Sequence, residues 1–366
     1  VRLPVDPPLP YHSYGARMIS LCLNLAQKIG FRASETALSI VFEWLGAAQK
    51  VPHWTGIRTW MQRFGVAAIE APIEEADDWI WMADHSVQIG PEKALLVLGI
   101  RASKMPELGT PLKHEDVRTL VVQPGAKWKQ EDTAAAYEAL AQRAGPPRAV
   151  LIDGAADLRG GAEVLKKQCP DTVVLSDFKH RAANILKSVL GKDERFIEFN
   201  TQLGRTRSAI QQTELAHLAP PSKKVKARFM NLAGMLDWAT MVLWHLEHPE
   251  SYTRQSITRE RFEEKLGWFR EYDQDVVVWQ ECQQVVSAGV TFVNEQGLFH
   301  GAADQLQQII ATKLTTAKGR EVADQLVNFF RESESLLKDS ERLPMSTEIV
   351  ESTFALYKQL ERQHSK

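Results

Sequence analysis

The spacing of apolar residues changes twice along this 366-residue chain, and these changes limit the folds that it can adopt. From Tyr14 to Gly65 apolar residues recur at helical spacing. Between Trp79 and Asp177 short apolar runs of the β type alternate with helical stretches. From Lys192 to Leu343 the strand signals largely stop and helical spacing returns. The pattern predicts an α/β core between two helical regions.

The middle region predicts a mixed five-stranded sheet. Its expected elements, in chain order, are strands 79–90, 93–103 and 118–123, helix 130–145, strand 148–153, helix 160–169, strand 171–177 and helix 178–191. A tight Gly90-Pro91 turn joins the first two strands. Three antiparallel strands followed by two crossover units is the ribonuclease-H-like order, in which the first and fourth strands lie side by side.

Three short helices are expected before the sheet, after a Pro-rich lead-in over residues 1–12. They cover 16–30, 34–46 and 54–65, with Thr55 as the cap of the third. Short helices with tight turns are typical of a helix-turn-helix module, whose last helix enters the major groove. The DNA-facing candidates on that helix are Arg58, Gln62 and Arg63. The alternative is a plain helical subdomain.

The remaining chain divides around an all-α insertion. We expect an N-terminal DNA-binding module over 1–72, the first part of the core over 73–190, the insertion over 191–343 and a final core helix over 344–366, capped by Ser346. The tryptophans of the insertion lie mostly at core spacing, although one of them could stack on an unpaired base.

Composition excludes several classes of protein. The 44 basic and 46 acidic residues give a net charge of −2, which argues against a generic nucleic-acid coat. No apolar run approaches the roughly 20 residues of a membrane span. Three scattered cysteines fit no metal or disulfide pattern and indicate a reducing cytoplasm. There is no phosphate-binding GxxxxGK[ST] run, no HExxH and no paired CxxC.

Three carboxylates stand in matching surroundings. Asp84 follows the apolar run of WIWMADHS, Asp153 ends RAVLID, and Glu351 lies in the expected last helix, STEIVESTFALYK. Phosphoryl transfer at a DNA phosphodiester uses two hard cations, and Mg²⁺ takes its ligands from carboxylates. With the first and fourth strands side by side, Asp84 and Asp153 can hold one ion and Glu351 can complete the second. A single Asp after a strand is more commonly a turn or cap residue, so the prediction of two Mg²⁺ or Mn²⁺ ions depends on the joint occurrence.

The segments MADHS, LIDGAADL, SDFKH and STEIVESTFALYK resemble those of DDE-type transposases of bacterial insertion sequences. The resemblance runs from about Trp79 to the end of the chain. Transposases of the hAT and mutator-like groups similarly carry an all-α insertion before the last acid, which fits the long interval here (351 − 153 = 198). The resemblance implies that Asp84, Asp153 and Glu351 are the metal-binding triad. It also implies that Asp177 and His180 support the site or contact DNA.

Several assignments stay open. Glu348 competes with Glu351, since residues three apart share a helix face. Asp177 is alternatively a helix N-cap with His180 facing solvent, and His85 is expected to be a local hydrogen-bond partner rather than a metal ligand. Ser346 and Ser352 are candidates for orienting the acid. Basic residues that could track the DNA backbone, or simply be solvated, are Lys223, Lys224, Lys226, Arg228 and Lys358.

The resemblance implies a DNA transposase. Such an enzyme would recognise the terminal repeats of a mobile element in double-stranded DNA, free a 3′-OH and transfer it to target DNA. It would act as a homodimer or larger assembly, near the nucleoid of a bacterial cytoplasm and away from any membrane. Two rivals are a metal-dependent nuclease or resolvase of the same fold, and a domesticated DNA-binding protein without catalysis. The chain starts without Met, which suggests a processed or excerpted start, and it ends only fifteen positions past Glu351 (366 − 351 = 15).

Overall fold

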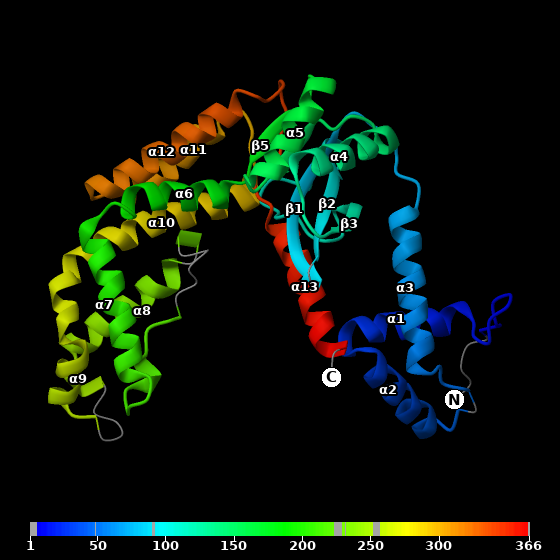
Figure 1. Cartoon of the computed structure of the whole chain (residues 1–366), viewed down its shortest axis with the longest axis horizontal. Coiled ribbons are helices and arrows are strands. Elements are labelled where there is room, and N and C mark those ends of the chain that lie inside the picture. Colours follow the sequence, from blue (N-terminus) through cyan, green and yellow to red (C-terminus); the bar gives the residue numbers. More distant parts are fainter. Residues whose placement is uncertain are drawn as a thin grey trace.

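Five strands form one mixed sheet in the order β3-β2-β1-β4-β5 (Figure 1). β1 to β3 pair antiparallel, whereas β4 runs parallel to β1 and β5 parallel to β4. The predicted element order and the predicted contact between the first and fourth strands are confirmed. The strands are β1 (Trp79–Ile89), β2 (Glu92–Arg101), β3 (Arg118–Gly125), β4 (Ala149–Ile152) and β5 (Val173–Ser176). The computed structural model describes residues 6–47, 49–89, 92–222, 229–230, 232–251 and 257–364, so the expected Gly90-Pro91 turn lies outside the described residues.

Helices cover both faces of the sheet, and alternating side chains of β1 enter two separate cores. Ile80 and Met82 pack in one core with α6, α10, α12 and α13. Trp81 and Ala83 pack in the other core with α4 and α5. Because side chains alternate along a strand, Asp84 continues the first set. The helices of these layers are α4 (Gln130–Ala144), α5 (Ala156–Gln168), α6 (Phe178–Leu190), α10 (Asp273–Gln296), α12 (Ala317–Glu334) and α13 (Glu348–His364).

Helix α5 begins four residues earlier than predicted, because its two glycines lie inside the helix rather than before it. They let α5 approach α4 closely: a Cβ on Gly161 would come within 2.7 Å of the Thr133 side chain. The tight α4–α5 contact fixes the start of α5, and with it the turn that follows β4.

The N-terminal helices are α1 (Ala16–Ile29), α2 (Phe31–Trp44) and α3 (Trp54–Glu70), packed on a small core of their own. α2 begins three residues before the predicted Ser34, whose hydroxyl donates to the Gly30 carbonyl inside the helix. α3 is capped by His53 instead of Thr55, since His53 Nδ1 accepts from the Thr55 N–H. It also continues past the predicted end at Gly65, a glycine that a helix tolerates at a cost of about 1 kcal/mol.

Between α6 and α13, the named elements of the described residues are all helical, as predicted. Besides α10 and α12 they include α7 (Glu194–Ile210), α8 (Leu232–Glu247), α9 (Arg259–Leu266) and α11 (Ala302–Ala311), with short 3₁₀ turns. Trp238 and Trp279 are buried and Trp268 is partly buried against the same core, as the spacing predicted, but Trp244 is 48% exposed.

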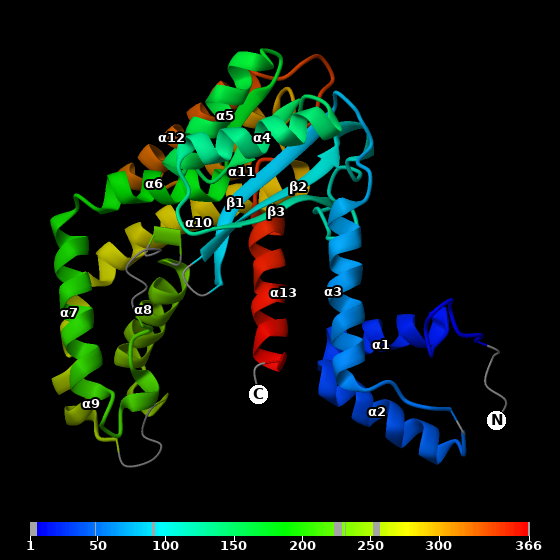
Figure 2. The ribbon, with the colours of Figure 1, turned by 45° about the vertical axis from the view of Figure 1, so that its right-hand side comes forward.

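The three regions are spread around the sheet (Figures 1 and 2). α7, α8 and α9 lie on one side of it and α1 to α3 on the other, while α13 runs away from the sheet between them. The start of α13 contacts β1 and β2. No helix in the described part of the chain is long and apolar enough to cross a membrane.

Candidate functional site

Asp84 and Asp153 lie next to each other on one face of the sheet. The parallel register of β1 and β4 pairs Ala83 with Ile152, so the next position on each chain is an aspartate. Both continue the set of side chains that packs against α6 and α13. The predicted adjacency of these two acids therefore follows from the strand pairing.

The environment of Asp84 disfavours its negative charge. Burial raises its pKa most, and the charges of Asp153 and Glu351 raise it further, from 3.8 to about 6. The nearby His180 opposes this shift. A carboxylate that is crowded by other carboxylates in a partly buried site gains from any cation placed among them.

Asp153 is fixed by the turn between β4 and α5. Its Oδ1 accepts from the Ala155 N–H at 2.8 Å, an Asx turn that leads into the first turn of α5. Gly154 between them has a φ of 91°, a conformation that favours glycine. The sequence Asp-Gly-Ala after the strand thus holds the carboxylate at the edge of the sheet.

The third acid is held by a lysine that the sequence analysis did not identify. Lys179 Nζ lies 3.1 Å from a carboxylate oxygen of Glu348 and 3.1 Å from one of Glu351. Burial lowers the pKa of Lys179, but its contacts with these two acids outweigh burial and raise it above the ordinary value. Lys179 therefore compensates part of the negative charge that Glu348 and Glu351 place on α13.

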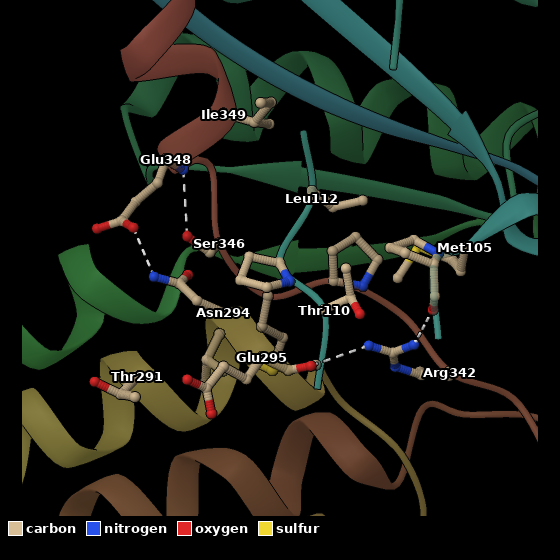
Figure 3. A pocket seen from close by; sticks show the side chains of 16 residues that line it. Met105, Thr110, Leu112, Thr291, Asn294, Glu295, Arg342, Ser346, Glu348 and Ile349 are labelled. Atoms are coloured by element: carbon tan, nitrogen blue, oxygen red, sulfur yellow. Dashed lines mark hydrogen bonds between the residues drawn. The ribbon is translucent and has the colours of Figure 1, made fainter. Parts of the chain in front are cut away.

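Glu348 and Glu351 differ in their other neighbours. Glu348 accepts a hydrogen bond from Asn294 Nδ2 at 2.6 Å and lines a cavity of about 300 Å³ between α10 and the segment before α13 (Figure 3). Glu351 instead acts electrostatically on Asp84 and His180. Of the two competing glutamates, Glu351 is the one whose charge acts on Asp84.

Asp177 joins the end of β5 to the start of α13. Its side chain caps α6, as the alternative in the sequence analysis expected, because Oδ1 accepts from the His180 N–H at 2.8 Å. The same oxygen lies 2.9 Å from His180 Nδ1, while Oδ2 accepts from the N–H and hydroxyl of Thr347. Burial would raise the pKa of Asp177, but these hydrogen bonds hold it below its ordinary value.

The same alternative expected His180 to face solvent. Its side chain is instead partly buried, with 25% of its surface exposed. Burial lowers its pKa, but the hydrogen bond to Asp177 and the charges of Asp177, Asp153 and Glu351 outweigh burial and raise it. The imidazole thus lies within the electrostatic field of the acids.

The serines near the acid have mainly local roles. Ser346 Oγ accepts from the Glu348 N–H at 3.2 Å, in the turn that begins α13 (Figure 3). Ser352 Oγ donates to the Ile349 carbonyl and lies 3.2 Å from His114 Nε2. Lys358, farther along α13, is exposed. These contacts fix the helix start, and none of them reaches the carboxylate of Glu351.

The DNA-facing candidates of the N-terminal module lie on α3. This helix is separate from α13, which carries Glu351 (Figure 2). Arg58, Gln62 and Arg63 are all exposed. The guanidinium groups of Arg58 and Arg32 both lie over the Trp54 ring, at 5.6 and 4.8 Å from its centroid. The basic cluster Lys223, Lys224, Lys226 and Arg228 lies outside the described residues.

The donor set suits a hard cation only in part. Within the part of the chain that the structure describes, no group of three or more His, Cys, Asp and Glu side chains is placed to hold a metal ion. Asp84 and Asp153 are adjacent carboxylates, which is the ligand chemistry that Mg²⁺ prefers. The carboxylate of Glu351 is occupied by Lys179. The site is thus a pair of aspartates, with its third acid engaged by an ammonium group.

Sequence reasoning missed Lys179, Thr347 and Asn294. A signal for Lys179 existed, because it opens the helix after β5, at the strand end nearest the two aspartates. Thr347 directly precedes α13, where a capping residue is expected. For Asn294 there was no signal, since it belongs to α10, whose position against α13 depends on the tertiary fold.

Comparisons with known proteins add a distant structural likeness. No protein-family model matches the sequence, and no curated protein matches it. Among solved structures, the chain is similar to one in the Drosophila P element transposase strand transfer complex, with a TM-score of 0.38 and 11% sequence identity. That alignment covers 92% of this chain and 85% of the other. A likeness of this degree carries no argument about the chemistry of the site.

Proposed function

We propose that this chain is a DDE-type DNA transposase with a ribonuclease-H-like core. The proposed core is formed by residues 73–190 and 344–366, interrupted by a helical insertion over 191–343 and preceded by a helix-turn-helix module over 1–72. The strand order β3-β2-β1-β4-β5 supports this assignment. So does the position of the late helix α13 against β1.

One observation carries the proposal above the others. Asp84 and Asp153 follow the paired residues Ala83 and Ile152, on the face of the sheet that α13 covers. The charge of Glu351, on that helix, contributes to the raised pKa of Asp84. The three acids are spread over 267 positions of sequence (351 − 84 = 267), and we propose that they act together at one edge of the sheet. Structural ion pairs alone do not require three acids with so little compensating charge in one place.

In the proposed mechanism Asp84 and Asp153 would hold the first cation and Glu351 would complete the site of the second. Bound Mg²⁺ or Mn²⁺ would activate the attacking oxygen and stabilise the leaving oxygen of an in-line displacement. Asp84 is mostly ionised at neutral pH, since its pKa is about 6, and so is ready to act as a ligand. Glu351 must exchange its contact with Lys179 for the cation.

Two displacements would follow at the same site. In the first, a water oxygen bonds to phosphorus and the bond from phosphorus to the 3′ oxygen breaks, which leaves a 3′-OH and a 5′-phosphate. In the second, that 3′ oxygen bonds to a target phosphorus and displaces a target 3′ oxygen. We propose His180 as the group that exchanges a proton beside the acids, because its hydrogen bond to Asp177 and the charges of Asp153 and Glu351 raise its pKa.

The proposed substrate is double-stranded DNA at the ends of a mobile element and at the target. Arg58, Gln62 and Arg63 on the exposed face of α3 are the proposed reading residues, and Lys358 on α13 is a proposed phosphate contact. Joining two element ends requires two active sites, so we propose a homodimer or a larger assembly on DNA.

The experiment measures cutting and joining on DNA of arbitrary sequence, so it does not depend on the sequence of the element ends. Supercoiled plasmid is incubated with the protein and Mn²⁺ or Mg²⁺, together with a labelled duplex that already carries a free 3′-OH. Wild type is expected to nick the plasmid and to join the labelled strand to it. Asp153→Asn is expected to lose at least 100-fold of both activities while keeping its circular dichroism spectrum.

Glu348→Gln and Glu351→Gln form a matched pair, one turn apart on the same helix. Glu351→Gln is expected to be as inactive as Asp153→Asn, whereas Glu348→Gln keeps most of the activity. Nicking without joining would replace the transposase by a nuclease of the same fold. Full metal-dependent activity in Asp153→Asn would refute the catalytic assignment.

A further inference from the structure

His85 faces the opposite side of the sheet from the acid that precedes it. Side chains alternate along β1, so His85 continues the set of Trp81 and Ala83, which packs against α4 and α5. Its side chain is only 7% exposed. The dipeptide Asp84-His85 therefore contacts both layers of the fold at the same point of the strand.

On that far side, His85 reaches the segment that carries the second acid. Its Nδ1 lies 3.0 Å from Asp157 Oδ2, and Asp157 is in the first turn of α5, directly after the Asp153 turn. One side-chain contact thus links the residue after Asp84 to the residue four positions after Asp153. The contact crosses the β1–β4 pair on the face of the sheet opposite Asp84.

The His85 ring has little freedom to leave this position. It packs against Trp128 with ring centroids 4.9 Å apart and ring planes tilted by 33°, and Trp128 Nε1 donates to the Lys93 carbonyl of β2 at 3.0 Å. Gly125 makes room for the indole, since a Cβ there would come within 3.0 Å of it. Asp157 is the side chain that fixes the ring's hydrogen-bonding direction.

We propose that His85 and Asp157 are positioning residues that set the separation of the Asp84 and Asp153 carboxylates. This inference rests on the proposed function, because the separation matters when the two acids share a cation. The Asx turn fixes Asp153 relative to α5, while the β1–β4 pairing and the α4–α5 contact set the general position of α5 against β1. The contact between His85 and Asp157 adds a direct side-chain link between β1 and the first turn of α5, next to the two aspartates. Residues that orient metal ligands in this way are typically worth 10- to 100-fold in metal affinity.

The test is a double-mutant cycle on Mn²⁺ affinity, measured by electron paramagnetic resonance of free Mn²⁺ on the full chain. His85→Phe keeps a flat ring on Trp128 and removes the contact with Asp157. Asp157→Ala removes the partner, and the double variant removes both. His85→Asn is the conservative variant, because its amide can place a donor near the position of Nδ1. Thermal unfolding of each variant confirms that it is folded.

The matched control is His248→Phe, at the end of α8. His248 also lies against a tryptophan, since its ring centroid is 4.6 Å from that of Trp244. His85→Phe is expected to weaken Mn²⁺ binding at least 10-fold, His85→Asn less than 3-fold, and the control not at all. The double variant is expected to bind Mn²⁺ as tightly as Asp157→Ala does, because both substitutions break the same contact.

The outcomes separate the two proposals. Unchanged Mn²⁺ affinity in His85→Phe, or fully additive losses in the cycle, would overturn the positioning role while leaving the proposed function intact. A wild-type protein that binds no Mn²⁺ would overturn both. Failure of His85→Asn to restore affinity would also count against the role, since a donor at that position is what the contact requires.

Discussion

The raised pKa of Asp84 predicts that removing its charge stabilises the metal-free protein. The unfolded chain binds its Asp84 proton with a pKa near 3.8, and the folded protein with a pKa of about 6. Between these values the folded state holds more protons than the unfolded state, so stability falls as pH rises. A shift of about 2 units is worth about 3 kcal/mol, at roughly 1.4 kcal/mol per unit. This loss is complete above pH 6 and absent below about pH 4.

The perturbation is Asp84→Asn, measured by thermal unfolding in EDTA at pH 7.5 and at pH 4. At pH 7.5 the variant is expected to be more stable than wild type by about 3 kcal/mol, or roughly 6 °C in Tm for a domain of this size. At pH 4 the two proteins are expected to unfold together, because Asp84 is then protonated in the folded state and the asparagine replaces a neutral group.

Asp177→Asn is the opposing control. Asp177 is also buried, but its hydrogen bonds lower its pKa, so it contributes stability above its unfolded pKa that is lost as pH falls through its lower folded pKa. Asp177→Asn is therefore expected to destabilise the protein at pH 7.5. An Asp84→Asn variant that is no more stable than wild type at pH 7.5, or that keeps its advantage at pH 4, would refute the electrostatic account of the site.

Three further predictions concern other parts of the molecule. Lys179→Met removes the partner of Glu351 in a partly exposed ion pair worth up to about 1 kcal/mol. Calorimetry is therefore expected to show Mn²⁺ bound up to about fivefold more tightly, and weaker binding would contradict competition between Lys179 and the cation. Arg148→Met breaks a buried pair, since Nε and Nη2 of Arg148 each lie 2.6 Å from Glu341, and is expected to cost about 3 kcal/mol in urea unfolding, with no loss if the pair is dispensable. Arg58→Ala is expected to weaken binding at the preferred DNA sequence by about 1–3 kcal/mol and to leave other sequences nearly unaffected in anisotropy titrations, whereas an even loss across sequences, with a slope of log K against log salt lower by about 1, would indicate a phosphate contact.

The layout of the sheet could be predicted because each step was local. Alternating apolar runs marked the strands, helical spacing marked the crossovers, and the succession of three antiparallel strands and two crossover units indicated the ribonuclease-H-like strand order. Once β1 and β4 were expected side by side, the adjacency of Asp84 and Asp153 followed from their positions at matching points of the two strands. The register of Ala83 with Ile152 confirms that step.

Helix ends were less predictable, for reasons visible in the contacts. Thr55 has the side chain of a typical cap, yet the His53 ring takes that role two residues earlier (55 − 53 = 2). Gly65 looked like a stop, but the helix continues through it to Glu70. At Asp177 the local signal for a cap was correct, whereas its bonds to Thr347 join positions 170 apart and had no local signal.

The rotation of α13 decides which glutamate faces the aspartates, and that rotation is set by tertiary contacts. Asn294 holds Glu348 on the α10 side, while Asp177 binds the backbone and hydroxyl of Thr347 just before the helix. Glu351 lies one helical turn on, and its charge acts on Asp84. The same arrangement sets the charge balance among the acids: Lys179 reaches both glutamates and compensates their charge, and burial and Asp153 keep the proton affinity of Asp84 high. In the proposed function, a cation bound by the acids would displace Lys179 from Glu351 and the proton from Asp84, so this balance of charge is the property on which the proposed chemistry depends.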